Sequence, residues 1–291
     1  MRALAEYIMR GRVQAALIAV LLVPVLPQAA LALVTLRRGI IDGLWVAMWA
    51  FTPMLVAIWS DKEFLPMAMV SLGTLLTVLV TATLLRLQMT WATTLIALVV
   101  IITVLGVIFL FMFDAQISAL VQEAIELQKT NLERQGIAYD ESLMVLPANQ
   151  YLLGLPSFGV AINVVIALVI GRWWQALLYN PGGFRQEFYQ LRMQPAFAVV
   201  LGVVTVICVS TDYRYWSWLP ALPLVMVSVS LAHQFAATQR MGGAWLVIYY
   251  LALFSMPFYL AMAAVGIVDS WTNMRSRLIP KSNTQGPQQG S

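Results

Sequence analysis

Apolar segments long enough to cross a lipid bilayer recur along the chain, and they limit its fold more than any other feature. The clearest are about 20 residues long, as a helix needs to span a hydrocarbon core of about 30 Å, and they cover 40–59, 65–85, 90–113 and 151–171. Only 10% of the residues are charged and 61% are hydrophobic, whereas soluble domains carry about 25% charged residues. The sequence therefore predicts an all-α polytopic membrane protein, because transmembrane helices satisfy their own backbone groups in lipid.

Further apolar segments raise the expected number of transmembrane helices to about eight. They cover 13–36, 196–210, 219–238 and 244–268. The first of them contains Pro24 and Pro27 and allows three interpretations. It is a kinked span, a re-entrant pair of half-helices, or a secretory signal with a cleavage-like site at 30–32.

Residues 114–144 combine charged and apolar side chains at helical spacing. Apolar residues such as Ile117 and Leu132 fall on one face, while Glu126 and Lys129 fall on the other. The pattern predicts an amphipathic helix that either extends the fourth span into water or lies on the bilayer. We expect residues 1–281 to form a single transmembrane domain with this helix as an insert at 114–144. Residues 282–291, rich in Gln, Gly and Ser, should be a disordered tail.

The connection over residues 172–192, which we call the collar, combines cations, aromatic side chains and a strong turn signal at Asn180-Pro181-Gly182-Gly183. We expect a long loop at the membrane surface, where aromatic rings lie among lipid headgroups and arginines reach phosphates. Because Trp, Tyr and Arg also dominate protein binding hot spots, a second interpretation is contact with a partner protein. The candidate contact residues are Arg172, Trp173, Trp174, Phe184, Arg185 and Arg192.

Polar side chains inside the predicted spans suggest a second candidate site. Thr74 and Thr77 belong to a stripe of hydroxyl side chains on the third span, Asn163 lies in the fifth, and His233 is the only histidine in the chain. Close helix packing with internally bonded hydroxyls, and a buried structural histidine, are one interpretation. The other is a polar ligand cavity, with Thr74, Thr77, Asn163 and His233 as candidate ligand-binding residues.

Charged residues near the ends of the spans are expected to pair at the membrane interface. They are Asp42, Asp212, Arg214, Asp269 and Arg275. The interior of the spans lacks the acidic residues that ion pumps and proton relays need at depth.

Several classes of function are disfavoured. The net charge of +4 is modest and the basic residues are scattered, so no nucleic-acid partner is expected. The single cysteine, Cys208, allows neither an intramolecular disulfide nor a cysteine metal cluster. The sequence has no Walker-type phosphate loop, dinucleotide glycine fingerprint, His-Glu-x-x-His or Gly-x-Ser-x-Gly motif. We therefore expect no enzymatic activity, no cofactor and no metal site.

Three stretches carry a resemblance to one family. They are 33–39 (Leu-Val-Thr-Leu-Arg-Arg-Gly), 173–184 (Trp-Trp-Gln-Ala-Leu-Leu-Tyr-Asn-Pro-Gly-Gly-Phe) and 266–271 (Gly-Ile-Val-Asp-Ser-Trp). There, and over most of residues 10–277, the chain resembles the uncharacterised YybS-like family of bacterial membrane proteins. That family has no established activity and is remotely similar to the substrate-binding S components of energy-coupling-factor vitamin transporters and to the rod-shape protein MreD. The resemblance implies a bacterial inner-membrane protein and allows an S-component-like bundle, although S components have six spans.

Two functions remain open. The first is a small-molecule-binding or transport-related membrane subunit, whose motor would be a separate protein and whose ligand is unknown. The second is a non-catalytic scaffold of the cell envelope, of the MreD kind, that acts through the collar and the amphipathic helix. Both place the protein in the inner (plasma) membrane, surrounded by lipid, with both termini expected in the cytoplasm.

Overall fold

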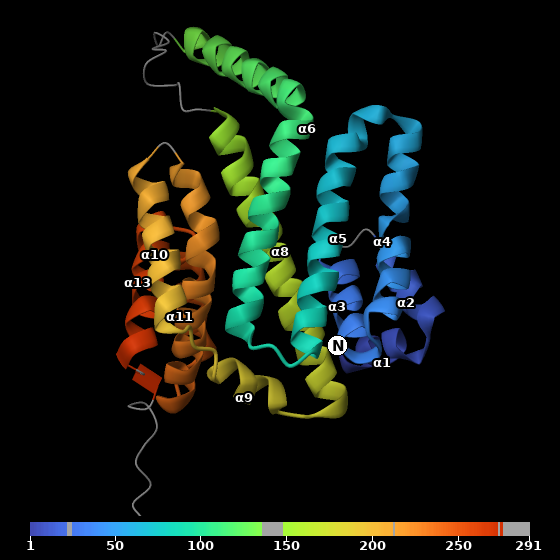
Figure 1. Ribbon diagram of the computed structural model, residues 1–291, viewed down its shortest axis with the longest axis vertical. Coiled ribbons are helices and arrows are strands. Elements are labelled where there is room, and N and C mark those ends of the chain that lie inside the picture. The colour runs from blue at the N-terminus through green and yellow to red at the C-terminus, as the bar shows by residue number, and fades with distance from the viewer. Residues whose placement is uncertain (22–24, 136–147, 212, 273, 276–291) are drawn as a thin grey trace, which may run out of the picture.

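The computed structural model describes residues 1–21, 25–135, 148–211, 213–272 and 274–275 (Figure 1). Within these ranges the chain is helical and contains no strand. This confirms the predicted all-α polytopic membrane class. The tail predicted at 282–291 lies outside the described residues.

The long helices run between the same two ends of the molecule (Figure 1). They are α4 (Ile40–Ser60), α5 (Leu65–Arg86), α6 (Trp91–Arg134), α8 (Ala148–Tyr179), α10 (Pro195–Ser210) and α11 (Trp218–Thr238). The short helix α9 (Gly183–Tyr189) lies across the lower end in Figure 1 and connects α8 to α10. We call this lower end the arginine end, because Arg86, Arg172 and Arg192 lie there.

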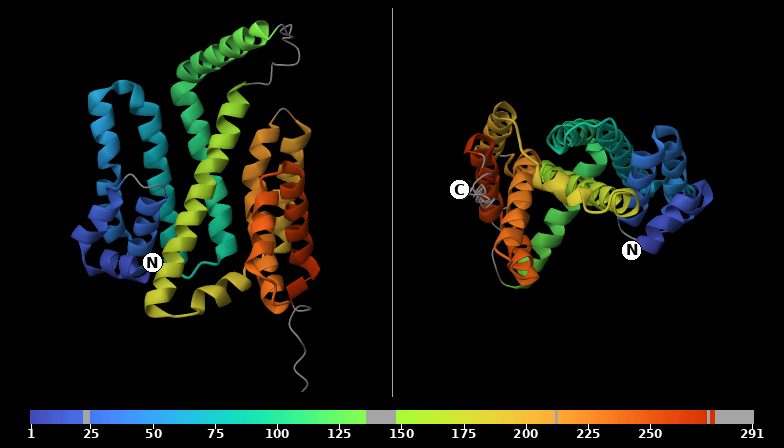
Figure 2. Two further views of the ribbon diagram at one scale, coloured as in Figure 1. Left: turned by 180° about the vertical axis from the view of Figure 1, so that it is seen from behind. Right: turned by 90° about the horizontal axis from the view of Figure 1, so that it is seen from below.

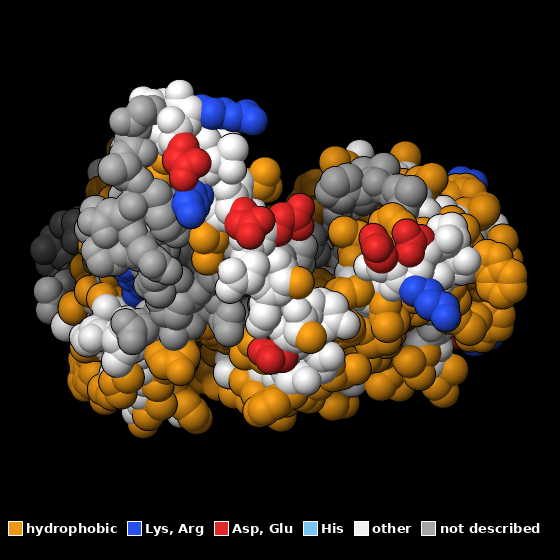
Figure 3. Space-filling model, turned by 90° about the horizontal axis from the view of Figure 1, so that it is seen from above, with side chains coloured by type: hydrophobic (Ala, Val, Ile, Leu, Met, Phe, Trp, Pro, Cys, Tyr) orange, Lys and Arg blue, Asp and Glu red, His pale blue; other side chains and the backbone are white. Residues whose placement is uncertain are grey.

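We call the opposite end the acidic end, and Figure 3 looks down on its Asp and Glu side chains. Some of them belong to the connection between α4 and α5, where the Asp61 carboxylate accepts a hydrogen bond of 2.9 Å from the amide of Glu63. This bond caps the short 3-10 helix η1 (Lys62–Phe64). Others, such as Glu126 and Glu133, belong to the outer part of α6. Charged side chains thus mark this end of the bundle, beyond the apolar parts of the helices.

The predicted fourth span and the described part of the predicted amphipathic helix follow each other within α6, as two helical segments joined at a kink. Phe113, the residue at which the sequence places the end of the span, has non-helical dihedral angles (φ −123°, ψ 22°). Beyond it, α6 bends away from the bundle axis (Figure 1). Phe113 and Ile117 are buried beside Met69 and Trp216, so packing holds the bend. Residues 136–144 of the predicted insert lie outside the described residues.

The predicted number of about eight spans is too high when helices are counted by whether they are long and apolar enough to cross a membrane. Among the described residues, five helices meet these criteria, or up to six if a bent pair counts as one span. The predicted span 196–210 is present as α10, which has 16 residues. The segments 13–36 and 244–268 account for the remaining difference, because each is a pair of shorter helices.

The segment 13–36 folds back to the end from which it starts. After α1 (Arg2–Arg10), α2 (Arg12–Ala19) and α3 (Leu26–Arg38) form a pair, and neither is long enough to cross a bilayer. Arg12 donates to Asp42 at 2.5 Å, and Arg38 donates to the carbonyl of Met9 at 2.5 Å. These bonds join the start of α2 to α4 and the end of α3 to α1, so the chain on either side of the segment meets at the arginine end. Of the three interpretations of 13–36, the structure favours the re-entrant pair.

The predicted eighth span, 244–268, is also divided. Its helices α12 (Gly243–Ala252) and α13 (Met256–Thr272) are bent by 110° relative to each other. Pro257 lies at the start of α13, where its missing N–H costs no helical hydrogen bond. The Tyr259 hydroxyl donates to the carbonyl of Trp218 at 2.9 Å, whereas Arg192 donates to the carbonyl of Ser270 at 2.8 Å. Helix α13 therefore returns to the arginine end beside α11.

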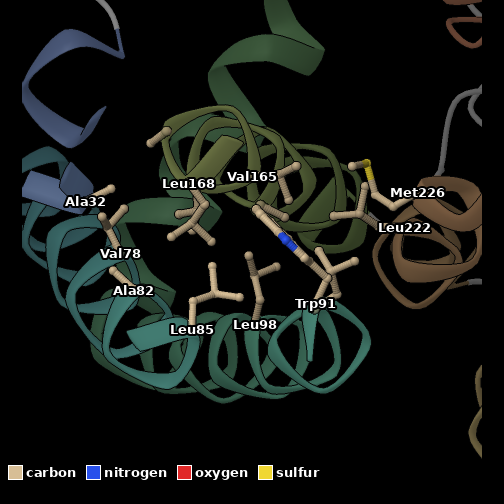
Figure 4. Packing of buried hydrophobic residues seen from close by; sticks show 14 of the residues in the cluster. Ala32, Val78, Ala82, Leu85, Trp91, Leu98, Val165, Leu168, Leu222 and Met226 are labelled. Carbon is tan, nitrogen blue, oxygen red and sulfur yellow. The ribbon is translucent and has the colours of Figure 1, made fainter. Parts of the chain in front are cut away.

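The core lies between α3, α5, α6, α8 and α11, whose inward side chains interdigitate (Figure 4). Leu98 on α6, Leu168 on α8 and Leu222 on α11 are each less than 2% exposed. Seen from below, α6 and α8 separate the N-terminal helices from the C-terminal group (Figure 2). The connection through α9 is therefore the place where the two groups meet at the arginine end.

Candidate functional site: an arginine-lined pocket

The collar is mostly helical, which corrects the expectation of a long loop. Helix α8 continues through the first part of the collar to Tyr179, because no glycine or proline interrupts it there. The predicted turn is confirmed: Gly182 has a φ of +86°, and the amide of Gly183 donates to the carbonyl of Asn180 at 3.0 Å. Helix α9 follows. The turn redirects the chain so that one face of α9 points back toward α6 and α8.

A pocket of about 570 Å³ opens at the arginine end. Its walls come from the turn between α5 and α6, from α8, from α9 and from the extended residues after α9. Its charged and aromatic lining residues are Arg86, Trp91, Arg172, Glu187 and Arg192, and we call it the arginine pocket. Gln88, in the turn, has a φ of +63°, a left-handed conformation that lets the chain reverse within a few residues. The reversal places Arg86 and Trp91 beside the same space.

One side of the arginine pocket is a network around Glu187. Its carboxylate accepts hydrogen bonds from Arg172 Nη2 at 2.9 Å, Arg172 Nε at 3.0 Å and Trp91 Nε1 at 2.7 Å. Arg172 Nη1 also donates to Gln175 Oε1 at 2.6 Å. The network connects α9 to both α6 and α8, and the charges of Arg172 and Glu187 offset each other.

The other two arginines of the pocket have neutral partners. Arg86 donates to the carbonyl of Leu36 at 3.0 Å, and Arg192 donates to the carbonyl of Ser270 at 2.8 Å. In the part of the chain that the structure describes, neither of them forms an ion pair with a carboxylate. The pocket therefore carries excess positive charge.

The predicted contact residues of the collar divide into an outer and an inner group. Trp173 is 39% exposed, and Arg185, also exposed, donates to the Tyr189 hydroxyl at 3.0 Å. For these two, contact with headgroups or with a partner stays a prediction. Trp174 is only 1% exposed, so its predicted surface contact is wrong, because this residue faces the core from α8.

The other members of that group lie at or near the pocket. Arg172 and Arg192 line it. Phe184 is half-buried, with its ring edge-on to Trp91 at 6.3 Å and stacked with Phe188 at 5.8 Å between centroids. Phe184 therefore packs against Trp91, which lines the pocket.

The other predicted site residues are not gathered around the arginine pocket. Thr74 and Thr77 donate to the carbonyls of Val70 and Gly73 in their own helix, both at 2.7 Å, as the packing interpretation predicts. His233 Nε2 lies 2.7 Å from the Tyr250 hydroxyl on α12. These residues and Asn163 come from α5, α8 and α11, and none lines the arginine pocket. Their role in ligand binding stays a prediction.

Asn163 differs from the threonines because its side-chain oxygen is buried and has no hydrogen-bond partner among the described residues. A buried unsatisfied acceptor is unusual in a folded protein. The threonine hydroxyls, by contrast, are satisfied within α5. Asn163 thus has an unused hydrogen-bonding group.

Charged residues near the helix ends form ion pairs outside the pocket. Asp42 pairs with Arg12 and Asp269 pairs with Arg275, which confirms the predicted interfacial pairing for these residues. Asp212 lies outside the described residues, and Arg214 lies over the Tyr215 ring.

The Asp269–Arg275 pair is buried, with its side chains 0% and 8% exposed. Burial lowers the pKa of Arg275, whereas the negative charge of Asp269 raises it. Arg275 also donates to the carbonyl of Tyr189. The pair therefore anchors the end of α9 to the C-terminal group of helices.

The sequence did not single out Arg86, Trp91 or Glu187. Arg86 and Trp91 lie at the ends of apolar helices, Glu187 lies within the short polar helix α9, and Trp91 and Glu187 are far apart along the chain. The signal available in the sequence was Arg86, a lone arginine in the short turn between two predicted spans. Only the fold shows that these residues share one pocket.

Comparison with known proteins leaves the family open. No protein-family model, no curated protein and no solved structure matches the chain. The resemblance of the collar and its companion stretches to YybS-like proteins therefore stays a prediction. The function has to be argued from the geometry of the arginine end.

Proposed function

We propose that this membrane protein is a small-molecule-binding, transport-related subunit whose ligand occupies the arginine pocket. The observation that carries the proposal is the pocket itself. Its volume of about 570 Å³ falls in the range of about 300–1,000 Å³ that is typical of small-molecule sites. It also combines apolar walls with a few convergent polar groups, as such sites do.

The arginine pocket is a better candidate than a cavity among Thr74, Thr77, Asn163 and His233. The hydroxyls of Thr74 and Thr77 are already used within α5, and His233 already contacts Tyr250. In the pocket, by contrast, Arg86 and Arg192 each keep further N–H donors beyond the one bonded to a backbone carbonyl. Because the sequence contains no nucleotide-binding motif, a motor for transport would be a separate protein.

Filling the arginine pocket tests the proposal. Gln190 lines the pocket and is exposed, so Gln190→Trp should narrow it without disturbing the core. We expect the protein, extracted gently from its native membrane, to carry a small molecule that native mass spectrometry detects. In Gln190→Trp the retained amount should fall by about tenfold, as loss of roughly 1.4 kcal/mol of binding energy would give.

Gln239→Trp is the matched control. Gln239 is also exposed, lies at the end of α11 and does not line the pocket. It should retain the ligand like the unmodified protein. The proposal fails if the unmodified protein carries no ligand and shows no thermal stabilisation across a panel of metabolites, or if both variants bind equally well.

The distribution of basic residues supports a topology with the arginine end in the cytoplasm. Among the described residues, the basic side chains of the acidic end are Lys62, Lys129, Arg134 and Arg214. The other arginines lie at the arginine end, from Arg2 on α1 to Arg275 after α13. An excess of Lys and Arg in short segments marks the cytoplasmic side. We infer that the protein resides in the plasma membrane with both termini cytoplasmic.

Cysteine labelling tests this topology. In a Cys208→Ala background, Gln190→Cys should react with a membrane-impermeant maleimide only after the membrane is opened. Glu133→Cys, on the outer part of α6, should react in intact cells. The reverse pattern would invert the orientation, and labelling of both from outside would contradict the placement of the two residues at opposite ends.

A scaffold role is the second candidate, and the outer face of the collar favours it. Tyr179 is 47% exposed, and Arg37 lies over its ring at 4.3 Å from the centroid. Together with Trp173 and Arg185, these side chains form an aromatic and basic surface. A scaffold would lose a specific protein partner on Trp173→Ala or Arg185→Glu while Gln190→Trp left that partner bound.

A further inference from the structure

We infer that the arginine pocket selects an anionic ligand group of the phosphate class, either on a soluble molecule or on a lipid headgroup. This inference rests on the proposed function and names the chemistry of its ligand. It depends on the charges, the donor geometry and the depth of the pocket, which are independent of one another.

The charges of the pocket fit a group with nearly two negative charges. Arg172 and Glu187 offset each other in an ion pair of 2.9 Å. Arg86 and Arg192 then remain, and within the described part of the chain each donates to a backbone carbonyl. A phosphate monoester carries about −1.5 to −2 charges at neutral pH, which matches this excess, and a phosphodiester lipid headgroup, with one negative charge, offsets part of it. Guanidinium groups bind phosphate oxygens through parallel hydrogen bonds.

The start of α6 adds donors on the same side of the pocket. Trp91 and Ala92, the first residues of this long helix, line the space. The first N–H groups of a helix have no partner within it, and they lie at the positive end of the helix dipole. Thr90 satisfies one of them, since its hydroxyl accepts from the amide of Thr93 at 3.2 Å. The remaining first-turn amides are suited to an anion.

The Glu187 carboxylate shows that the inner donors suit an oxyanion. It accepts from the Trp91 indole at 2.7 Å and from Arg172, so these donors already converge on negatively charged oxygen. A ligand anion placed between Arg86 and Arg192 would extend this arrangement across the pocket.

One side of the pocket is more buried than an ordinary ring of surface arginines. Arg172 lies about two turns before the end of α8, which corresponds to roughly 10 Å along the helix axis. Its side chain is directed to Glu187, and its exposed fraction is 27%. The Arg172 side of the pocket is therefore partly buried, and electrostatic attraction is stronger there than in water, whereas Arg86 and Arg192 lie at its exposed mouth.

The test uses the full-length protein in nanodiscs of neutral phosphatidylcholine, with inorganic phosphate as the probe and sodium chloride of equal ionic strength as the reference. Thermal unfolding is followed as phosphate is added. In a parallel arm, native mass spectrometry measures retention of phosphatidylglycerol from mixed nanodiscs. The variants are Arg86→Gln and Arg192→Gln. Arg185→Gln is the control, because Arg185 lies at the same end but does not line the pocket.

We expect saturable stabilisation by phosphate, with a half-saturating concentration about tenfold higher in Arg86→Gln and in Arg192→Gln, as loss of a charge-assisted hydrogen bond implies. Arg185→Gln should match the unmodified protein. If phosphate has no effect but phosphatidylglycerol is retained and lost in the same two variants, the anion is a lipid headgroup, which also supports the inference. Should Arg86→Gln fail to fold, Arg192→Gln decides, since Arg192 is exposed on an extended segment.

Two results would overturn the inference. One is the absence of any effect of phosphate together with no retention of phosphatidylglycerol. The other is an equal loss in Arg185→Gln, which would indicate general surface charge. A neutral ligand displaced by Gln190→Trp would refute the phosphate class and leave the proposed function standing, whereas the absence of any ligand sensitive to Gln190→Trp would refute both.

Discussion

Asp269→Asn is expected to destabilise the folded protein by about 3–5 kcal/mol. The substitution removes the negative charge beside Arg275, whose side chain is 8% exposed, and leaves that guanidinium buried without a counter-charge. It also weakens the acceptor for the amide of Met274, which donates to Asp269 at 3.0 Å. Thermal unfolding of detergent-solubilised protein, followed by fluorescence-detected size exclusion, measures the effect.

Asp42→Asn is the matched control for a surface pair. Asp42, which is 16% exposed, pairs with Arg12, which is 55% exposed; water screens this pair more than the buried one, and exposed pairs contribute about 0–1 kcal/mol. The double variant Asp269→Asn/Arg275→Met should recover part of the lost stability, because it leaves no unpaired buried charge. Equal losses in Asp42→Asn and Asp269→Asn would contradict the difference in burial.

Gly266→Ala should be the second most damaging substitution. A Cβ atom at Gly266 would lie 2.2 Å from the carbonyl oxygen of Leu224. Because that atom belongs to the backbone of α11, it cannot move aside as a side chain can. Helices α11 and α13 would have to separate, and we expect a loss of about 3 kcal/mol, at the upper end of overpacking effects. The same unfolding assay applies.

Gly159→Ala provides the control within another long helix. A Cβ at Gly159 meets no atom within 4 Å, and alanine favours a helix over glycine by about 1 kcal/mol. Gly159→Ala should therefore leave stability unchanged or raise it slightly. If Gly266→Ala proved as mild as Gly159→Ala, the close approach of α11 and α13 would be incorrect.

The sequence predicts the class of the fold and several local details well. The spans at 40–59, 65–85 and 151–171 correspond to α4, α5 and α8, because twenty apolar residues in lipid have few alternatives to a helix. The predicted end of the fourth span, Phe113, coincides with the kink of α6, although the apolar helix that could cross a membrane continues to Ala119. The Asn180–Gly183 turn follows from residues that favour a reversal wherever they occur.

Other features depend on contacts that composition does not encode. Hydropathy shows that 13–36 and 244–268 are apolar, but it does not show that the chain reverses within or beside them. The ion pair of Arg12 with Asp42 joins the start of α2 to the start of α4, on either side of the first of these reversals. Likewise, Trp174 resembles a headgroup anchor in the sequence, and only its position on the inner face of α8 identifies it as a core residue.

The arginine pocket is the clearest case of such a limit. The arginines of the collar suggest a role at the membrane surface, and that expectation names Arg172 and Arg192. That expectation gives no reason to place Arg172 and Arg192 in one pocket with Arg86, which lies in the turn between α5 and α6. The hydrogen bond between Trp91 and Glu187, which forms one wall of the pocket, requires the tertiary arrangement of α6 and α9.

The helices that stop short of the acidic end give the molecule unequal cross-sections. The pair α2–α3 begins and ends at the arginine end, and α3, with 13 residues, is about 20 Å long. These helices therefore displace lipid mainly from one leaflet (Figure 2). A protein that occupies more area in one leaflet than in the other is wedge-shaped. The lipids around it must pack differently in the two leaflets.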